Sequence, residues 1–291
     1  MKKRSLFYLI LIALAVCAFV GFRFWEGISH DAKAPEIRMG DEILELSVTD
    51  PQERFLEGIS AVDNRDGDVT GSVVVEKIKL TDAAEGLAEV SLAAFDKSGN
   101  VAKFSRTVRY TDYHGPRFSL NQPLVYAQNS GMNVLDRICA EDVFDGDLSH
   151  HIRATSLSDT GLSGAGIHNV EFRVANSLGD VVKLVIPVEV RDYVISYADV
   201  ILTEYLVYLQ PGDSFQAKDY LNGFKLNQEF TSLSGRLPAG YRLETEGTVN
   251  TQVPGVYAVS YTVTYTVTGT NPGVNDRDYT GYSKLIVVVE G

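Results

Sequence analysis

The chain has 291 residues, of which 45% are hydrophobic, so it is long enough to form two or three separate cores. When Lys2, Lys3, Arg4, Arg23 and Glu26 are removed from the totals of 26 basic and 38 acidic residues, the remainder of the chain holds 22 basic and 37 acidic residues, a net charge of −15. A surface this acidic repels phosphate backbones, which argues against nucleic-acid binding.

The N-terminal segment is predicted to target a membrane. A basic cluster at residues 2–4 precedes an uncharged apolar run at 6–22, and Trp25 follows at a position suited to the membrane interface. Ala13-Leu14-Ala15 is typical of a signal-peptide cleavage site, but the apolar run continues beyond it. An uncleaved anchor and a cleaved signal peptide therefore both stay open for residues 1–27. The basic cluster predicts a single-pass protein of the cell membrane with an extracellular C-terminal region.

Cysteine usage argues against a fold held together by disulfides. The chain has two cysteines, and only Cys139 lies outside the apolar N-terminal segment. No intrachain disulfide can therefore form in the exported part, although its location is oxidising. The exported part must be stabilised by apolar cores or by bound ions.

Two stretches of the exported part are copies of each other. "AVDNRDGDVT" at 61–70 and "AEDVFDGDLS" at 140–149 align without gaps as A-x-D-x-x-D-G-D, 79 positions apart. "DKSGNVAK" at 96–103 and "NSLGDVVK" at 176–183 follow at a separation of 80 positions. A repeat of about 80 residues is typical of a small β-sandwich and not of a solenoid unit.

A third copy is more divergent. "AKDYLNGF" at 217–224 keeps Ala217, Asp219, Asn222 and Gly223 in register with the first two copies, with Phe224 in place of the last acid. The stretch "GVYAV" at 255–259 repeats a G-x-x-x-V step of the other copies. The chain is therefore expected to contain three tandem repeats.

Strand patterns dominate each repeat. Tyrosine and valine alternate with alanine, serine and threonine from 257 to 267, a period of two that indicates a strand with one buried face. Further strands are expected at 89–95, 101–109, 170–175 and 181–190, with short glycine-containing loops that close hairpins. We predict an all-β fold of three tandem immunoglobulin-like β-sandwiches after one N-terminal transmembrane helix. The predicted parts are the cytoplasmic tip and anchor 1–27, a linker 28–34, and domains 35–112, 113–192 and 193–291.

A family resemblance rests on the order of the motifs in the first repeat: A-x-D-x-x-D-G-D-[VL]-[TS], then a G-x-x-x-V strand, then D-x-S-G-N-x-A, and then a valine-rich strand that ends at Asp112. A repeat with this order resembles the bacterial immunoglobulin-like domains of the insecticidal-crystal-protein type, a domain-of-unknown-function family related to hyalin repeats. The first repeat matches best, whereas the second has Asn176, Leu178 and Asp180 at the hairpin positions of aspartate, serine and asparagine. The resemblance implies extracellular modules of Gram-positive surface proteins that serve as stalks, spacers, adhesive units or companions of carbohydrate-active enzymes. It implies no reaction.

The repeated acidic motif suggests a calcium site as one interpretation. Its acids are Asp63, Asp66, Asp68, Asp142, Asp145 and Asp147. The spacing does not fit an EF-hand, because the twelfth position counted from Val62 is Val73 and not glutamate. The alternative needs no ion: the glycine supplies a turn with positive φ, and the acids accept hydrogen bonds from nearby backbone amides. Any calcium effect is expected in the first two domains and not in the third.

The segment 269–281 is predicted to be a long hairpin loop that could recognise a ligand. Its candidate binding residues combine polar and aromatic groups: Asn271, Asn275, Asp276, Arg277, Asp278, Tyr279 and the adjacent Tyr282. Loops at hairpin tips often carry recognition residues. The alternative is a tolerated insertion without a binding role.

No pattern in the sequence predicts catalysis. The chain has no G-x-S-x-G motif, and Cys139 lies in an apolar-alternating stretch where a small buried side chain is the ordinary explanation. We therefore expect a non-enzymatic cell-surface protein with a structural or adhesive role, and no cofactor unless calcium binds. The alternative is a module that recognises a glycan or calcium. The expected partners are the membrane and either a cell-wall glycan or another surface protein.

Overall fold

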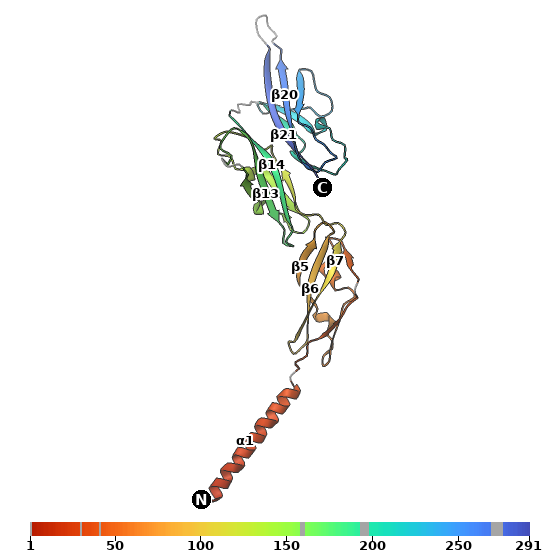
Figure 1. The fold of residues 1–291 in the computed structure, drawn as a ribbon, viewed down its shortest axis with the longest axis vertical. Helices are drawn as coiled ribbons and strands as arrows, with labels where there is room; N and C mark the ends of the chain where they lie inside the picture. The colour runs from red at the N-terminus through yellow and green to blue at the C-terminus, as the bar shows by residue number, and fades with distance from the viewer. Residues whose placement is uncertain (1, 30, 41, 158–160, 193–197, 269–275) are drawn as a thin grey trace. The chain divides into compact units, whose positions relative to one another are not determined.

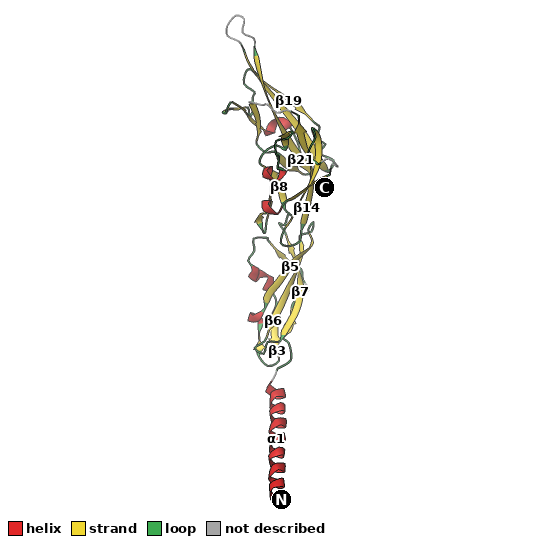
Figure 2. Cartoon of the chain, turned by 90° about the vertical axis from the view of Figure 1, so that its left-hand side faces the viewer, coloured by secondary structure: helices red, strands yellow, loops and turns green. Residues whose placement is uncertain are grey.

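The computed structural model describes residues 2–29, 31–40, 42–157, 161–192, 198–268 and 276–291. One long helix, α1 (Lys2–Ser29), is followed by strands and short 3-10 helices (Figure 2). The expectation of a β-rich exported part is confirmed. Residues 1–113 form one compact unit and residues 114–291 form a second (Figure 1).

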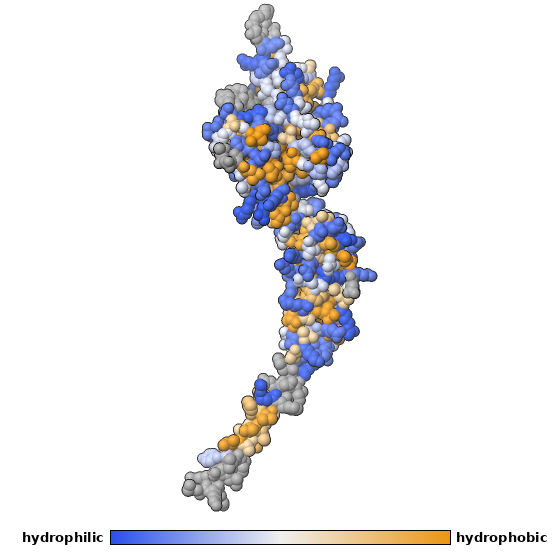
Figure 3. Space-filling view, viewed as in Figure 1, coloured by the Kyte–Doolittle hydropathy of each residue, from blue (hydrophilic) through white to orange (hydrophobic). Residues whose placement is uncertain are grey.

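Helix α1 covers the predicted membrane segment. Its apolar side chains at Leu11, Leu14 and Phe19 are 47%, 62% and 65% exposed. Figure 3 shows hydrophobic surface over the part of the helix that is not drawn in grey. Across the described residues, no helix combines the length and the apolar character that a membrane crossing requires.

The first sandwich consists of a three-stranded and a four-stranded sheet. The smaller sheet has the order β1 (Glu36–Arg38), β3 (Ser60–Asp63), β4 (Gly67–Asp68). The larger sheet has the order β2 (Leu44–Leu46), β7 (Val101–Tyr110), β6 (Leu87–Phe95), β5 (Val74–Asp82). Alternate side chains of β6 fill the core between the sheets, where Val90 and Leu92 are buried.

The second and third sandwiches repeat this arrangement. In the second sandwich, the smaller sheet has the order β8 (Arg117–Leu120), β10 (Ile138–Asp142), β11 (Gly146–Asp147), and the larger sheet has the order β9 (Val125–Ala127), β14 (Val181–Arg191), β13 (Gly166–Ala175), β12 (Arg153–Ser156). In the third sandwich, the smaller sheet has the order β15 (Ala198–Leu202), β17 (Leu221–Leu226), β18 (Glu229–Ser232), and the larger sheet has the order β16 (Leu206–Leu209), β21 (Arg277–Val289), β20 (Gly255–Val267), β19 (Tyr241–Glu246). In each sandwich the second strand pairs in parallel with the last one. Identical strand order in all three confirms that the chain is an immunoglobulin-like tandem array.

The predicted hairpins form as expected. Asp96 and Asn176 each begin a loop in which a backbone N–H three residues later, on Gly99 or Gly179, bonds back to the carbonyl of the first residue. The two glycines have φ values of +86° and +87°, a conformation that glycine adopts without strain. The repeated glycine is therefore required by the backbone of the hairpin.

The alignment of the third copy is wrong at the acidic motif. Asp219 lies in the 3-10 helix η5 (Ala217–Tyr220), before the strand, whereas Asp63 and Asp142 are the last residues of their strands. Gly223 lies within β17 without the positive φ of the turn glycines. An added Cβ there would stand 2.2 Å from the Phe230 ring, so this glycine permits a close approach and does not form a turn.

Strands β16 and β21 contribute to two cores at once. Leu206, Ile286 and Val288 join the core of the second sandwich, while Val287 and Val289 join the core of the third. The stretch Leu285–Val289 is accordingly buried throughout, which explains a continuous apolar run in place of alternation. The second and third sandwiches therefore share a hydrophobic junction within the unit 114–291.

Candidate functional site

The acids of the first repeated motif lie at a tight turn between β3 and β4. Gly67 has a φ of +74°, and the Asp63 Oδ1 atom accepts hydrogen bonds from the backbone N–H groups of Arg65 and Asp66 at 2.7 and 2.8 Å. Asp66 accepts from the backbone N–H of Lys97 in the β6–β7 hairpin, at 2.8 Å. The motif thus fastens one turn to a hairpin far away in the sequence.

The second copy of the motif repeats these contacts. Asp142 accepts from the N–H groups of Phe144 and Asp145, and Asp145 accepts from both the N–H and the hydroxyl of Ser177. Asp147 accepts from the Ser149 N–H, as Asp68 does from the Thr70 N–H in the first copy. The last two acids of each copy therefore have structural partners in the turn and the neighbouring hairpin.

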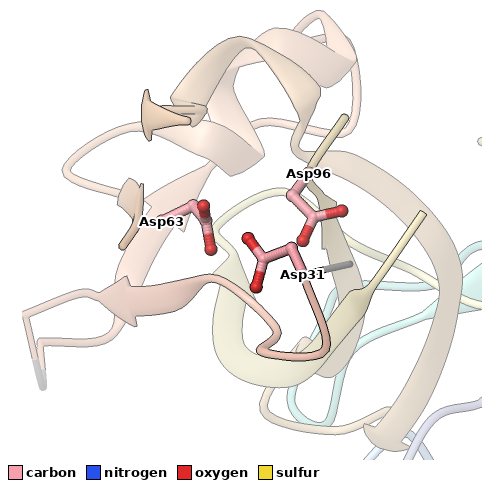
Figure 4. Close-up of side chains that lie close together, drawn as sticks. All are labelled: Asp31, Asp63 and Asp96. Atoms are coloured by element: carbon pink, nitrogen blue, oxygen red, sulfur yellow. The ribbon is translucent and has the colours of Figure 1, made fainter. Parts of the chain in front are cut away.

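Three carboxylates from separate segments meet in the first sandwich. Asp31 follows α1, Asp63 ends β3 and Asp96 follows β6; one oxygen of each lies within 4.8 Å of the others (Figure 4). Their exposed fractions are 5%, 3% and 9%. Asp63 belongs to the predicted metal set, whereas Asp66 and Asp68 are not part of this cluster.

Two oxygens of this cluster lack any hydrogen-bond partner. The Oδ2 atoms of Asp31 and Asp63 are both fully buried and unsatisfied. The backbone N–H groups of Asp66 and Arg65 hold the pKa of the Asp63 carboxyl below its ordinary value, which favours its charged form. Among the described residues, no lysine or arginine forms an ion pair with any of the three. Buried charges are normally paired with an opposite charge or bound to a metal, so this cluster lacks the positive partner that buried carboxylates usually have.

In the second sandwich, a side-chain amide takes the place of one carboxylate of the cluster. Asn176 occupies the position of Asp96, and its Nδ2 donates to the Oδ2 of Asp142 at 3.1 Å. That oxygen corresponds to the unsatisfied Oδ2 of Asp63. Asp112 stands where the first copy has Asp31, since both begin a D-x-x-x-P stretch, and its carboxylate accepts from the Ser47 hydroxyl and the Val48 N–H. Carboxylate clustering is thus a feature of the first copy.

Two of the three clustered residues are not among the candidates that the sequence offers. Asp31 lies in the predicted linker 28–34 but is buried in the structure, and Asp96 lies in a predicted hairpin loop. The signal that could have found them is the paired comparison of "DAKAP" with "DYHGP" and of "DKSGN" with "NSLGD". In the second pair the carboxylate and the amide change places: Asp96 aligns with Asn176, and Asn100 aligns with Asp180.

A charged network joins the second and third sandwiches. Lys284, only 4% exposed, donates to the carboxylate of Glu189, which also accepts from the Arg191 side chain and from the Tyr282 hydroxyl. The Arg191 guanidinium lies over the Tyr282 ring at 3.4 Å from its centre. At the other side of the junction, Arg117 forms an ion pair with Glu290 at 2.9 Å.

A cavity of about 500 Å³ opens beside this network. Its walls come from both sandwiches and include Arg137, Arg191, Tyr205 and Tyr282. Guanidinium groups beside aromatic rings and a few polar side chains suit a small polar ligand such as a sugar. The cavity is therefore a candidate binding pocket that the sequence did not indicate.

The described residues of the set predicted for the hairpin loop lie in strand β21 or just before it. Strand β21 begins at Arg277, so this residue, Asp278 and Tyr279 are paired with β20 and do not belong to a loop. The Thr266 hydroxyl donates to Asp278, and Tyr279 packs against the core of the third sandwich. Tyr282 lies at the junction, away from the hairpin end. Asp276 is exposed before β21, and Asn271 and Asn275 lie outside the described residues.

No family model matches the chain, and no curated protein matches it. The resemblance to insecticidal-crystal-protein immunoglobulin-like domains is therefore still a prediction from the sequence.

Several solved structures match the chain at low sequence identity. The structure of CBM51-2 and INT domains from Clostridium perfringens ZmpB in complex with GlcNAc is 20% identical, with a TM-score of 0.22, over 52% of this chain and 26% of that one. The protocadherin GammaB4 extracellular domain is 10% identical, with a TM-score of 0.19, over 88% and 49%. Human CDH23 EC21-23 is 12% identical, with a TM-score of 0.21, over 88% and 100%. The chain thus spans about a quarter of the first structure and about half of the second, and alignments with TM-scores this low assign no function.

Proposed function

We propose that this chain is a non-catalytic surface protein in which tandem immunoglobulin-like modules serve a structural or adhesive role. The observation that carries the proposal is the shared core of the second and third sandwiches, to which Ile286 and Val288 contribute. A junction with buried apolar side chains and a buried ion pair favours one stiff unit over two freely moving modules. A stiff unit suits a stalk or spacer, since it holds whatever it presents at a fixed position.

The proposal includes attachment to the cell membrane by α1, with the sandwiches outside the cell. It is supported by the basic residues at 2–4 and by the exposed apolar side chains of α1. Fractionation of expressing cells tests it: the chain is expected in the membrane fraction, and protease added outside should digest the sandwiches. Replacement of Leu11, Leu14 and Phe19 by serine should release the chain. A chain that stays soluble, or one that is protected from external protease, would contradict the proposal.

The adhesive role is tested by attachment of cells that display the chain to surfaces coated with envelope glycan or with envelope protein. Displayed wild-type chain should increase attachment, and Ile286→Asp should reduce it because a buried charge disrupts the junction. The control is Ile167→Asp, since Ile167 is 67% exposed on β13. Equal attachment with and without the chain would contradict the adhesive role and favour a spacer role.

Glycan recognition is the second candidate, and the cavity at the junction favours it. We infer that a neutral or acidic sugar fits beside Arg137 and Tyr205, because aromatic faces bind sugar rings and guanidinium groups bind carboxylates. Ile201→Trp would fill the cavity, and Val185→Trp, at a 37% exposed position of β14, is the control. Glycan binding that is lost only with Ile201→Trp supports the pocket. Binding that is lost on deletion of residues 269–275 but not with Ile201→Trp points to the hairpin instead.

A further inference from the structure

The strongest unexplained feature of the molecule is the cluster of Asp31, Asp63 and Asp96. The acidic pattern alone would not identify a site, because this chain is rich in surface acids. The cluster differs from those acids in that all three side chains are at least nine-tenths buried. Two of its oxygens, the Oδ2 atoms of Asp31 and Asp63, are also fully buried without a hydrogen-bond donor. Buried carboxylate oxygens without donors require a positive partner.

We propose that Asp31, Asp63 and Asp96 bind one calcium ion. Two oxygens bonded to the same calcium at 2.3–2.6 Å can be at most about 5 Å apart, and the three ligand oxygens lie within 4.8 Å of one another. The cluster contains only carboxylates, which suit a hard cation, and neither histidine nor cysteine, which would suit zinc or copper.

The second sandwich supplies the internal comparison. There an amide N–H of Asn176 satisfies the oxygen of Asp142 that corresponds to the unsatisfied oxygen of Asp63. An amide donor and a cation are two ways to complete the same group of oxygens. The second copy has the amide donor, and the oxygens of the first copy have the spacing that a cation requires.

The ion would join three segments that are separate in the sequence. Asp31 lies two positions after the last residue of α1, Ser29, and its backbone carbonyl already accepts a hydrogen bond from the Asn100 side chain at 3.1 Å. The ion would add bonds from the same segment to the end of β3 and to the start of the β6–β7 hairpin. Calcium would thus fasten the segment after the helix to the body of the first sandwich. This inference rests on the cluster alone and does not depend on the proposed surface role.

Calorimetric titration of the full chain in detergent micelles with calcium chloride tests the proposal. The expected result is one calcium per chain, with a dissociation constant of about 10⁻⁴ to 10⁻³ M, as in extracellular modules. Asp31→Asn and Asp63→Asn should each weaken binding at least about tenfold, since each removes a charged ligand. Asp68→Asn and Asp142→Asn are the matched controls and should bind as the wild type does. Absence of binding, or equal loss in the controls, would overturn the proposal.

Thermal unfolding separates a lost site from a lost fold. In chelator, Asp63→Asn should unfold at the wild-type temperature or above it, because the substitution removes repulsion between buried carboxylates. Saturating calcium should raise the unfolding temperature of the first unit by about 10 °C in the wild type and leave the variant unchanged. A variant that unfolds below the wild type in chelator would show that the carboxylates stabilise the fold without a cation, and would overturn the proposal.

Discussion

At the scale of single residues, an amide and a carboxylate at one position separate the two copies of the acidic motif. Asn176 donates to Asp142, whereas Asp96 only accepts, from the N–H and the side chain of Asn100, and the Oδ2 of Asp63 has no donor among the described residues. The acids Asp66 and Asp145 of the two copies make the same contacts with the neighbouring hairpin, so the contrast lies in the hairpin residues that face Asp63 and Asp142.

Asn176→Asp should therefore destabilise the unit 114–291. The substitution removes the donor to Asp142 and places two buried carboxylates together, at a cost of about 1–3 kcal/mol in the free energy of unfolding. Urea unfolding at neutral pH measures it. Asn169→Asp, at an exposed position of β13, introduces the same charge and should change the free energy by less than about 0.5 kcal/mol. Equal effects of the two substitutions would refute this account of Asn176.

The buried Glu189–Lys284 pair predicts an acid-sensitive junction. Burial raises the pKa of the Glu189 carboxyl, but hydrogen bonds and charges from Lys284 and Arg191 outweigh burial, so the pKa lies below its ordinary value of 4.5. A carboxyl with a lower pKa in the folded state stabilises the fold above about pH 4.5, and this contribution is lost as the pH falls through the folded pKa. The unit 114–291 should lose stability more steeply below pH 4.5 in the wild type than in Glu189→Gln. Parallel pH profiles of urea unfolding would contradict this.

Removal of one partner gives a second test of the same pair. Lys284→Met should cost about 3–5 kcal/mol because it leaves Glu189 buried without its closest cation. Lys183→Met, at an exposed position of β14, is the matched control and should be nearly neutral. Similar free energies for both variants would mean that the buried pair contributes nothing to the junction.

At the scale of elements, β21 links two cores through its alternating faces. Ile286 faces the second sandwich and Val287 faces the third, and both are fully buried. Sequence alone predicted strands and hairpins because their patterns are local: a period of two, and glycine at a positive φ. It could not assign Leu285–Val289 to two cores, because an apolar run reports burial on both faces without naming what covers them.

Ile286→Ala should uncouple the two sandwiches as well as destabilise them. The lost side chain costs about 2–5 kcal/mol, and the cavity lies at the junction. Val287→Ala is the control, since its cavity lies within the third sandwich. Hydrogen exchange should show faster opening of β8 and β14 with Ile286→Ala than with Val287→Ala. Similar exchange in both variants would argue against coupling through β21.

At the scale of the whole molecule, three repeats form two compact units. The repeat pattern predicted three sandwiches of the same kind, and their strand orders agree. The candidate metal site was only partly predictable, because Asp31 and Asp96 come from segments more than thirty positions from Asp63 and no local pattern reports their approach. The third copy was misaligned because a 3-10 helix with an aspartate resembles the acidic turn in composition alone.

Scanning calorimetry of the full chain in micelles, with calcium or with chelator, tests the central claim most directly. The account predicts two unfolding transitions of the sandwiches, one for each compact unit, and a calcium-dependent shift of the first unit only. Asp63→Asn should abolish the shift, and Ile286→Ala should split the transition of the unit 114–291. Three independent transitions in the wild type, or a calcium shift in the unit 114–291, would contradict the account.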